Sequence, residues 1–188
     1  AAVILFPSCS ESTWEQTDNG VIMRLKSEIP ELIRIEVLDE GIMHVTATAQ
    51  EDFSDDASLC VIGPKNAAPS FTVREDPDTL VIIAPKVTAK VALTDGQVTF
   101  SDENGKILLK EKPGGGKTFK RITVEDTRGY AMGQVFSSPP DESFYGLGQH
   151  QSDEFNYKGL NEVLYQYNTK VSVPFIVSGR TYGLLWDN

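Results

Sequence analysis

Apolar and polar residues alternate with a period of two along most of the chain. In residues 33–37 the apolar side chains fall on one face and the charged ones on the other, and residues 43–48 repeat the alternation. Asp39, Glu40 and Gly41 lie between these two runs and are residue types common in turns. A period of two is that of a β-strand with one buried face, so this stretch predicts a β-hairpin.

The same pattern extends over the rest of the chain. Asp95-Gly96 and Asn104-Gly105 are turn dipeptides between further alternating runs, and no long window places apolar residues at helical spacing. Other strands are predicted at residues 21–25, 71–73, 79–84, 86–93, 97–100, 106–109, 119–124, 130–136, 171–177 and 181–186. Many short strands separated by turn residues predict an all-β fold, an antiparallel β-sandwich.

Two segments interrupt the alternation. Residues 112–117 contain consecutive glycines and predict a flexible loop. Residues 137–161 are rich in Pro, Gly, polar and aromatic residues. Loops of this length in a compact domain are usually functional or disordered, and the aromatic content argues against disorder. The second segment is therefore predicted to be a functional loop.

The excess of acidic over basic residues argues against a nucleic-acid partner. Across 188 residues, 17 Lys and Arg stand against 27 Asp and Glu, which gives a formal net charge of −10. Nucleic-acid binding requires clustered cations that neutralise phosphates, and the sequence has no such cluster, so we expect no nucleic-acid partner. Two His and two Cys leave little material for a zinc site, so no metal is expected. No apolar run approaches the ~18–20 residues of a membrane span.

The first residues differ from the rest of the chain. Residues 1–6 are purely apolar, and Cys9 follows them closely. A short apolar run of this kind is typical of the end of a secretory signal, and the cysteine indicates a lipoprotein box. We therefore expect residues 1–20 to be a signal remnant and linker, and residues 21–188 to form the β-domain. Cys9 would carry a lipid, and the protein would lie at a bacterial cell envelope with this anchor as its membrane contact. The alternative is a first core strand with an incidental cysteine.

Familiar catalytic motifs are absent. Residues 116–118 resemble the end of a phosphate-binding loop, but Glu111 stands where that motif requires glycine. Residues 146–148 begin a dinucleotide-binding pattern, but Gln151 stands at its third glycine. The chain has no G-x-S-x-G nucleophile motif. Cys60 lies in an apolar run and is expected to be a small core residue rather than a nucleophile.

A group of amide, imidazole and aromatic side chains occurs within the long loop. His150 lies beside Gln149, and Phe155, Asn156 and Tyr157 follow shortly after. Aromatic rings stack on the C–H faces of sugars, and amides pair with sugar hydroxyls, so this composition suits carbohydrate recognition. The alternative is that the rings fill the core and the polar residues cap turns.

Several segments of the C-terminal half carry a family resemblance. They are residues 144–151 (FYGLGQHQ), 156–159 (NYKG), 173–178 (VPFIVS) and 182–188 (YGLLWDN), together with residues 94–105, which end in a D-E-N-G turn. These segments resemble the N-terminal domain of family 31 glycoside hydrolases. The Gln-His-Gln variant and the lipoprotein-like start are most similar to α-xylosidases and α-glucosidases of Bacteroidetes.

This resemblance implies a fold for the chain and a separate catalytic domain. The N-terminal domain of the family is a galactose-mutarotase-like β-supersandwich that packs on a (β/α)8 barrel, and the barrel performs retaining hydrolysis of α-linked sugars with two Asp residues. Such a barrel needs about 250 residues, and the family's W-x-D-M-x-E nucleophile motif does not occur in this chain. The resemblance therefore implies a domain without catalytic residues and without a cofactor, whose partners are its own barrel and, through the whole enzyme, an α-linked oligosaccharide.

The resemblance also implies a role for one loop. In the family, a loop of the N-terminal domain extends over the barrel mouth and lines the substrate site, and residues 156–168 occupy that position here. The candidate substrate-loop residues are Gln149, His150, Asn156, Tyr157, Lys158, Tyr165, Gln166 and Asn168. For each of them an ordinary loop contact is an equal alternative. At the level of the whole chain, the alternatives are a self-sufficient carbohydrate-binding module and an envelope lipoprotein scaffold.

Overall fold

Antiparallel strands make up all the regular structure that the computed structural model describes, namely in residues 13–25, 30, 32–54, 56–62, 69–151 and 153–187. The apolar run of residues 1–6 and the predicted lipidation site Cys9 lie outside these residues. The described part of the chain contains no helix that could cross a membrane.

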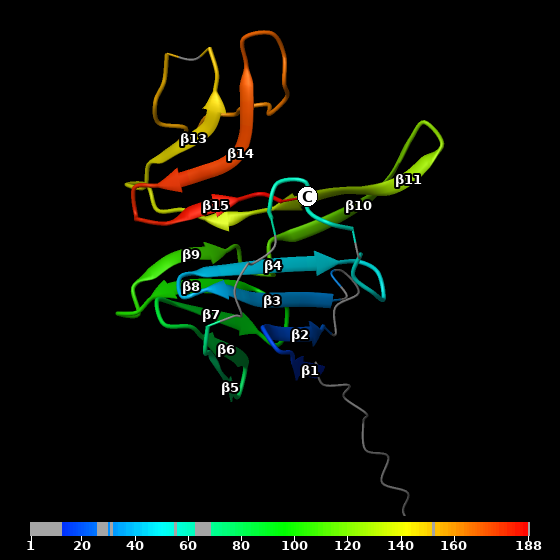
Figure 1. The fold of residues 1–188 in the computed structure, drawn as a ribbon, viewed down its shortest axis with the longest axis vertical. Coiled ribbons are helices and arrows are strands. Elements are labelled where there is room, and N and C mark those ends of the chain that lie inside the picture. The colour runs from blue at the N-terminus through cyan, green and yellow to red at the C-terminus, as the bar shows by residue number, and fades with distance from the viewer. Residues whose placement is uncertain are drawn as a thin grey trace, which may run out of the picture.

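Two sheets pack face to face (Figure 1). The first has the order β1-β2-β3-β4, with β1 (Thr13–Gln16), β2 (Gly20–Arg24), β3 (Leu32–Asp39) and β4 (Ile42–Thr48). The second has the order β12-β9-β8-β7-β6-β5, with β5 (Thr72–Asp76), β6 (Thr79–Ile83), β7 (Val87–Ala92), β8 (Val98–Asp102), β9 (Ile107–Glu111) and β12 (Phe136–Ser137). The predicted all-β sandwich is therefore confirmed.

The hydrophobic core lies between these two sheets. In β3, Ile33, Ile35 and Val37 are buried, whereas Arg34 and Glu36 point to the outer face. The matching core positions of the second sheet include Leu80 and Ile82 of β6. Burial of each such side chain contributes about 1.5–3 kcal/mol to stability. Because the alternation places these side chains on one face of each sheet, the two sheets pack together through their apolar faces.

A smaller sheet and a hairpin complete the fold. The third sheet has the order β13-β14-β15, with β13 (Phe144–Gln149), β14 (Val171–Ser178) and β15 (Gly183–Leu185). Strands β10 (Lys117–Val124) and β11 (Thr127–Gln134) form a separate two-stranded ribbon, which we call the arm. Figure 1 shows the third sheet beyond the sandwich and the arm projecting to one side.

The structure corrects the predictions at three places. Residues 137–161 were predicted to be a loop but contain β13, whose pairing with β14 is interrupted by a bulge between Gly146 and Gly148. Lys117 was predicted to lie in a flexible loop but begins β10, and its side chain is buried. Cys60 was predicted to be a core residue but is exposed, because its segment lies outside the strands and beside Leu59, which is itself 97% exposed.

Candidate functional site

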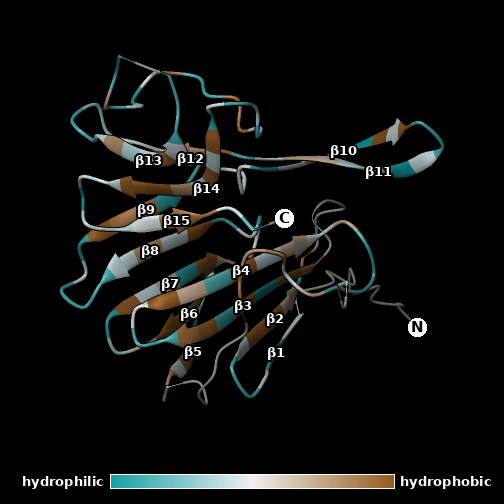
Figure 2. Cartoon of the chain, turned by 45° about the horizontal axis from the view of Figure 1, so that its top comes forward, coloured by the Kyte–Doolittle hydropathy of each residue, from teal (hydrophilic) through white to brown (hydrophobic). Residues whose placement is uncertain are grey.

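One face of the third sheet is apolar and exposed. It consists of Val171, Val173, Phe175 and Val177 of β14, Tyr145 of β13 and Leu185 of β15. The four β14 residues are between 40% and 49% exposed, and Figure 2 shows the hydrophobic colouring of this strand. Contiguous exposed apolar side chains mark interaction surfaces in soluble proteins. We call this surface the β14 face.

Strand β13 enters the candidate loop through an unusual backbone. Gly146, Leu147 and Gly148 all have positive φ angles, of 117°, 64° and 98°. A Cβ atom on Gly148 would collide with the carbonyl oxygen of Val171 on the neighbouring strand. Glycine at position 148 therefore allows β13 and β14 to pair beyond the bulge and sets the place where the loop leaves the sheet.

The first part of the loop is fixed by Asn156. Its Oδ1 accepts hydrogen bonds from the backbone N–H groups of Phe144 and Lys158, both at 3.0 Å, and its Nδ2 donates to Ser143 Oγ at 3.3 Å. The backbone N–H of Tyr157 donates to the carbonyl of Phe144 at 2.9 Å. Asn156 thus uses its polar atoms to hold the loop against β13.

Lys158 is also engaged within the chain. Its Nζ donates to Ser138 Oγ and, at 2.8 Å, to the carbonyl oxygen of Pro139, and it lies 5.4 Å from the centre of the Phe144 ring. The amine is therefore satisfied by three contacts beside the sheet.

The second part of the loop has a different character. Gln166 exchanges two hydrogen bonds of 3.2 Å with the backbone of Ser172, and Asn168 adopts a positive φ of 48° in the turn before β14. Tyr165 and Tyr167, on either side of Gln166, are 48% and 68% exposed, and their ring centres are 6.2 Å apart. Gln166 anchors this segment, so the two tyrosine rings are the groups that it presents to solvent.

Two predicted residues lie at the root of the loop. Gln149 ends β13 opposite Val171 and is exposed. The His150 side chain is 1% exposed, and its ring nitrogens lie close to the Leu147 carbonyl and the Glu162 carboxylate. Among the predicted residues, the structure thus brings His150 near the loop interior and leaves Gln149, Tyr165 and Asn168 exposed.

Sequence reasoning did not find the buried carboxylate of Glu142. Its Oε1 accepts hydrogen bonds from Ser178 Oγ at 2.6 Å and from the Tyr182 hydroxyl at 2.7 Å, and its Oε2 accepts one from Ser138 Oγ at 2.7 Å. Burial opposes ionisation of Glu142, but these hydroxyl donors outweigh it and hold the pKa of its carboxyl below the ordinary value. Burial and the neighbouring carboxylate raise the pKa of the Tyr182 phenol, which keeps its proton.

The Glu142 cluster positions the third sheet. Ser178 ends β14 and Tyr182 precedes β15, so one carboxylate ties both strands to the segment before β13. The available sequence signal was a polar residue, Ser178, at the end of an apolar strand, but nothing in the chain order identifies its partner 36 positions earlier.

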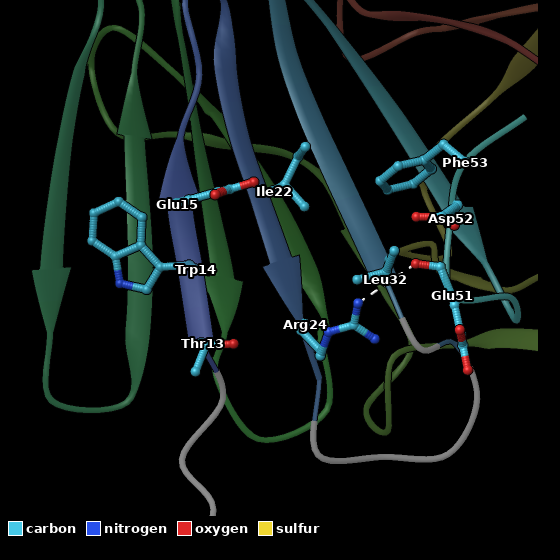
Figure 3. A pocket seen from close by; sticks show the side chains of 9 residues that line it. All are labelled: Thr13, Trp14, Glu15, Ile22, Arg24, Leu32, Glu51, Asp52 and Phe53. Carbon is cyan, nitrogen blue, oxygen red and sulfur yellow. Dashed lines mark hydrogen bonds between the residues drawn. The ribbon is translucent and has the colours of Figure 1, made fainter. Parts of the chain in front are cut away.

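A hollow elsewhere on the described part of the surface has a different lining. This hollow, of about 370 Å³, lies on the outer face of the first sheet (Figure 3). Trp14 points away from Phe53 there, and its Nε1 already donates to Glu75 Oε2 at 2.7 Å. Arg24 donates to the backbone oxygen of Glu51 at 3.5 Å. In the described ranges, no cluster of three or more His, Cys, Asp or Glu could hold a metal ion.

Known proteins are similar to this chain over most of its length. The model of a family described as the glycosyl hydrolase 31 N-terminal galactose mutarotase-like domain matches residues 32–188. The fold is similar to that of a GH31 α-xylosidase from Xanthomonas citri, with 39% identity and a TM-score of 0.87, over 93% of this chain and 19% of that one. It is also similar to a GH31 α-xylosidase from a soil metagenome, solved with xylose, with 27% identity and a TM-score of 0.76, over 93% of this chain and 28% of that one.

A further relative is also an α-xylosidase. An α-xylosidase of Saccharolobus solfataricus is 36% identical over 48% of this chain and 14% of its own length. The chain thus spans less than a third of each of these three relatives.

Proposed function

This chain belongs to glycosyl hydrolase family 31, as an N-terminal galactose mutarotase-like domain, and on that premise we propose that it is the non-catalytic β-sandwich of an α-xylosidase or α-glucosidase. A (β/α)8 barrel elsewhere in the enzyme would carry out retaining hydrolysis of α-linked oligosaccharides. Two carboxyl groups roughly 5–5.5 Å apart perform that chemistry. The similarity to two solved α-xylosidases over 93% of the chain favours the xylosidase.

The β14 face is the surface that would pack on the barrel. In β14, half-exposed apolar residues alternate with residues that face the other side of the sheet. An apolar sheet face of this kind is normally covered by a second layer, which here would be a partner domain. This alternation in β14 is the observation that carries the proposal.

The loop of residues 156–168 would contribute to the substrate site. Asn156 and Gln166 hold its two ends to the sheet, so Tyr165 and Tyr167 present their rings on a fixed base. Ring faces of this kind stack on the C–H groups of pyranose sugars. In the whole enzyme, the two tyrosines would therefore affect substrate affinity more than the rate of the chemical step.

A comparison of the isolated chain with the full-length enzyme tests the proposal. The chain alone is expected to show no hydrolysis of aryl α-xylosides or α-glucosides, whereas the full-length protein hydrolyses one of them. In the full-length protein, Tyr165→Ala is expected to raise KM with little change in kcat, and Tyr130→Ala on the arm serves as the control. Turnover by the rigorously purified chain would contradict a non-catalytic role.

The exposed rings also favour a second candidate, a self-sufficient carbohydrate-binding module. Phe155 is 89% exposed and adds a third ring to Tyr165 and Tyr167. Calorimetry of the isolated chain with xyloglucan and malto-oligosaccharides separates the two functions. A binding module gives roughly micromolar to millimolar affinity, about −8 to −4 kcal/mol, whereas a substrate loop without its barrel gives no measurable heat.

We also propose a location at the bacterial cell envelope through a lipid on Cys9. The support is the apolar run of residues 1–6 directly before the Pro-Ser-Cys sequence. Metabolic labelling with a fatty acid in a bacterial host is expected to mark the full-length protein and not its Cys9→Ala variant. Equal labelling of both proteins would contradict lipidation at this residue.

A further inference from the structure

His150 lies buried between two acceptor groups. Its Nε2 is 2.7 Å from the carbonyl oxygen of Leu147, and its Nδ1 is 3.1 Å from Glu162 Oε1. The contact with Leu147 is a hydrogen bond, whereas the contact with Glu162 is close but lies off the hydrogen-bond direction. With the His150 side chain 1% exposed and that of Glu162 15% exposed, water has little access to this pair.

Glu162 has a second partner beside His150. Lys170 Nζ lies 3.4 Å from the same Glu162 oxygen that faces the His150 ring. The Glu162 carboxylate is therefore held between His150 and Lys170.

His150 connects two features that shape the loop. Leu147 lies in the bulge of β13 with a positive φ of 64°, a conformation that a non-glycine residue keeps only when its surroundings hold it. Glu162 lies in the middle of the loop, and its second partner Lys170 lies 5.4 Å from the centre of the Tyr165 ring. A chain of contacts thus runs from the bulge through His150, Glu162 and Lys170 to Tyr165.

From this chain of contacts we propose that His150 is the positioning residue that fixes Glu162 and the Tyr165 ring relative to β13. This role rests on the proposed function, since it matters for catalysis only if the loop lines a substrate site. His150 itself does not contact the sugar. It holds the loop in the conformation that presents the tyrosine.

Hydrogen exchange of the loop amides tests the positioning itself. In His150→Phe, which keeps a ring but has no nitrogen, and in the milder Glu162→Gln, the amides of residues 160–168 are expected to exchange at least about tenfold faster. His44→Phe is the matched control, because His44 makes a similar 3.2 Å contact with Glu36 on the first sheet. Unchanged exchange in folded Glu162→Gln would overturn the proposal.

A kinetic readout separates this role from a purely structural one. In the full-length enzyme, Glu162→Gln is expected to raise KM several-fold while kcat stays near that of the unmodified enzyme. A fall in kcat with unchanged KM would contradict positioning of a substrate loop. If the full-length protein hydrolyses no α-glycoside, the proposed function fails, but hydrogen exchange still decides the role of His150.

Discussion

Lys117 and Glu111 form a buried ion pair at the root of the arm. Lys117 Nζ lies 2.6 and 2.5 Å from the two carboxylate oxygens, and the two side chains are 6% and 5% exposed. Burial lowers the pKa of Lys117 and raises the pKa of Glu111, even though each ion favours the charge of the other. Glu111 Oε2 also accepts the backbone N–H of Val98 at 2.9 Å, so the pair joins the first strand of the arm to the sandwich.

Loss of one partner of this pair is expected to destabilise the domain. Lys117→Met leaves an uncompensated carboxylate in a buried position and should lower the free energy of unfolding by about 3–5 kcal/mol. The double variant Glu111→Gln/Lys117→Met keeps an acceptor for Val98 and removes the lone charge, so it should recover most of that loss. Urea denaturation measures both. Arg74→Met, at the exposed pair with Asp76, is the control and should show no measurable change. A double variant no more stable than Lys117→Met would contradict this account.

The Glu142 cluster predicts sensitivity to acid. The folded-state pKa of Glu142 lies below its ordinary value, so its contribution to stability is complete above the pKa of the unfolded carboxyl and is lost as pH falls through the folded pKa. Glu142→Gln should reduce the free energy of unfolding by about 1–2 kcal/mol at pH 7. The difference from the unmodified protein should shrink below about pH 4, near the ordinary pKa of a carboxyl. Urea midpoints measured at several pH values check this, and a difference independent of pH would show that the charge is irrelevant.

Glycine at position 148 is expected to be irreplaceable. In Gly148→Ala, both the positive φ and the collision with the Val171 carbonyl oppose the side chain, so the loss should exceed about 1–2 kcal/mol and β13–β14 pairing should weaken. Gly159→Ala has a positive φ of 77° but open space, and should cost only about 1–2 kcal/mol. Gly129→Ala has neither constraint and is the neutral control. Thermal unfolding of the three variants should follow this order, and equal melting temperatures would contradict it.

The β14 face is expected to drive self-association of the isolated chain. Val173→Thr/Val177→Thr keeps β-branched side chains of nearly the same shape while making the surface polar, so folding should be little affected and association should fall. Sedimentation velocity over a range of concentrations measures this. Met132→Thr on the arm, where Met132 is 41% exposed, is the control. If the unmodified chain stays monomeric at high concentration, the prediction that the β14 face drives self-association is wrong.

Most strands could be predicted because the alternation that marks them is a property of neighbouring residues. In residues 33–37, alternation of apolar and charged residues predicts which face is buried, and β3 buries Ile33, Ile35 and Val37 as expected. The strand at residues 144–149 was missed because Gly146 and Gly148 break the alternation, and it pairs only through contact with the distant β14. The candidate loop was found from its amide and aromatic composition and from family resemblance. Composition could not separate the anchoring Asn156 and Gln166 from the exposed Tyr165 and Tyr167.

The sequence by itself determined the all-β class, the main hairpins and the family, because alternation, turn residues and motifs such as YGLLWDN are properties of neighbouring positions. Only the tertiary structure decided that Lys117 and Glu142 are buried, that Cys60 is exposed, and that His150 lies beside Glu162. Burial and pairing of a polar group depend on residues far along the chain that the fold brings within a few ångströms. The free energy of a charge depends on those neighbours rather than on its own position in the sequence.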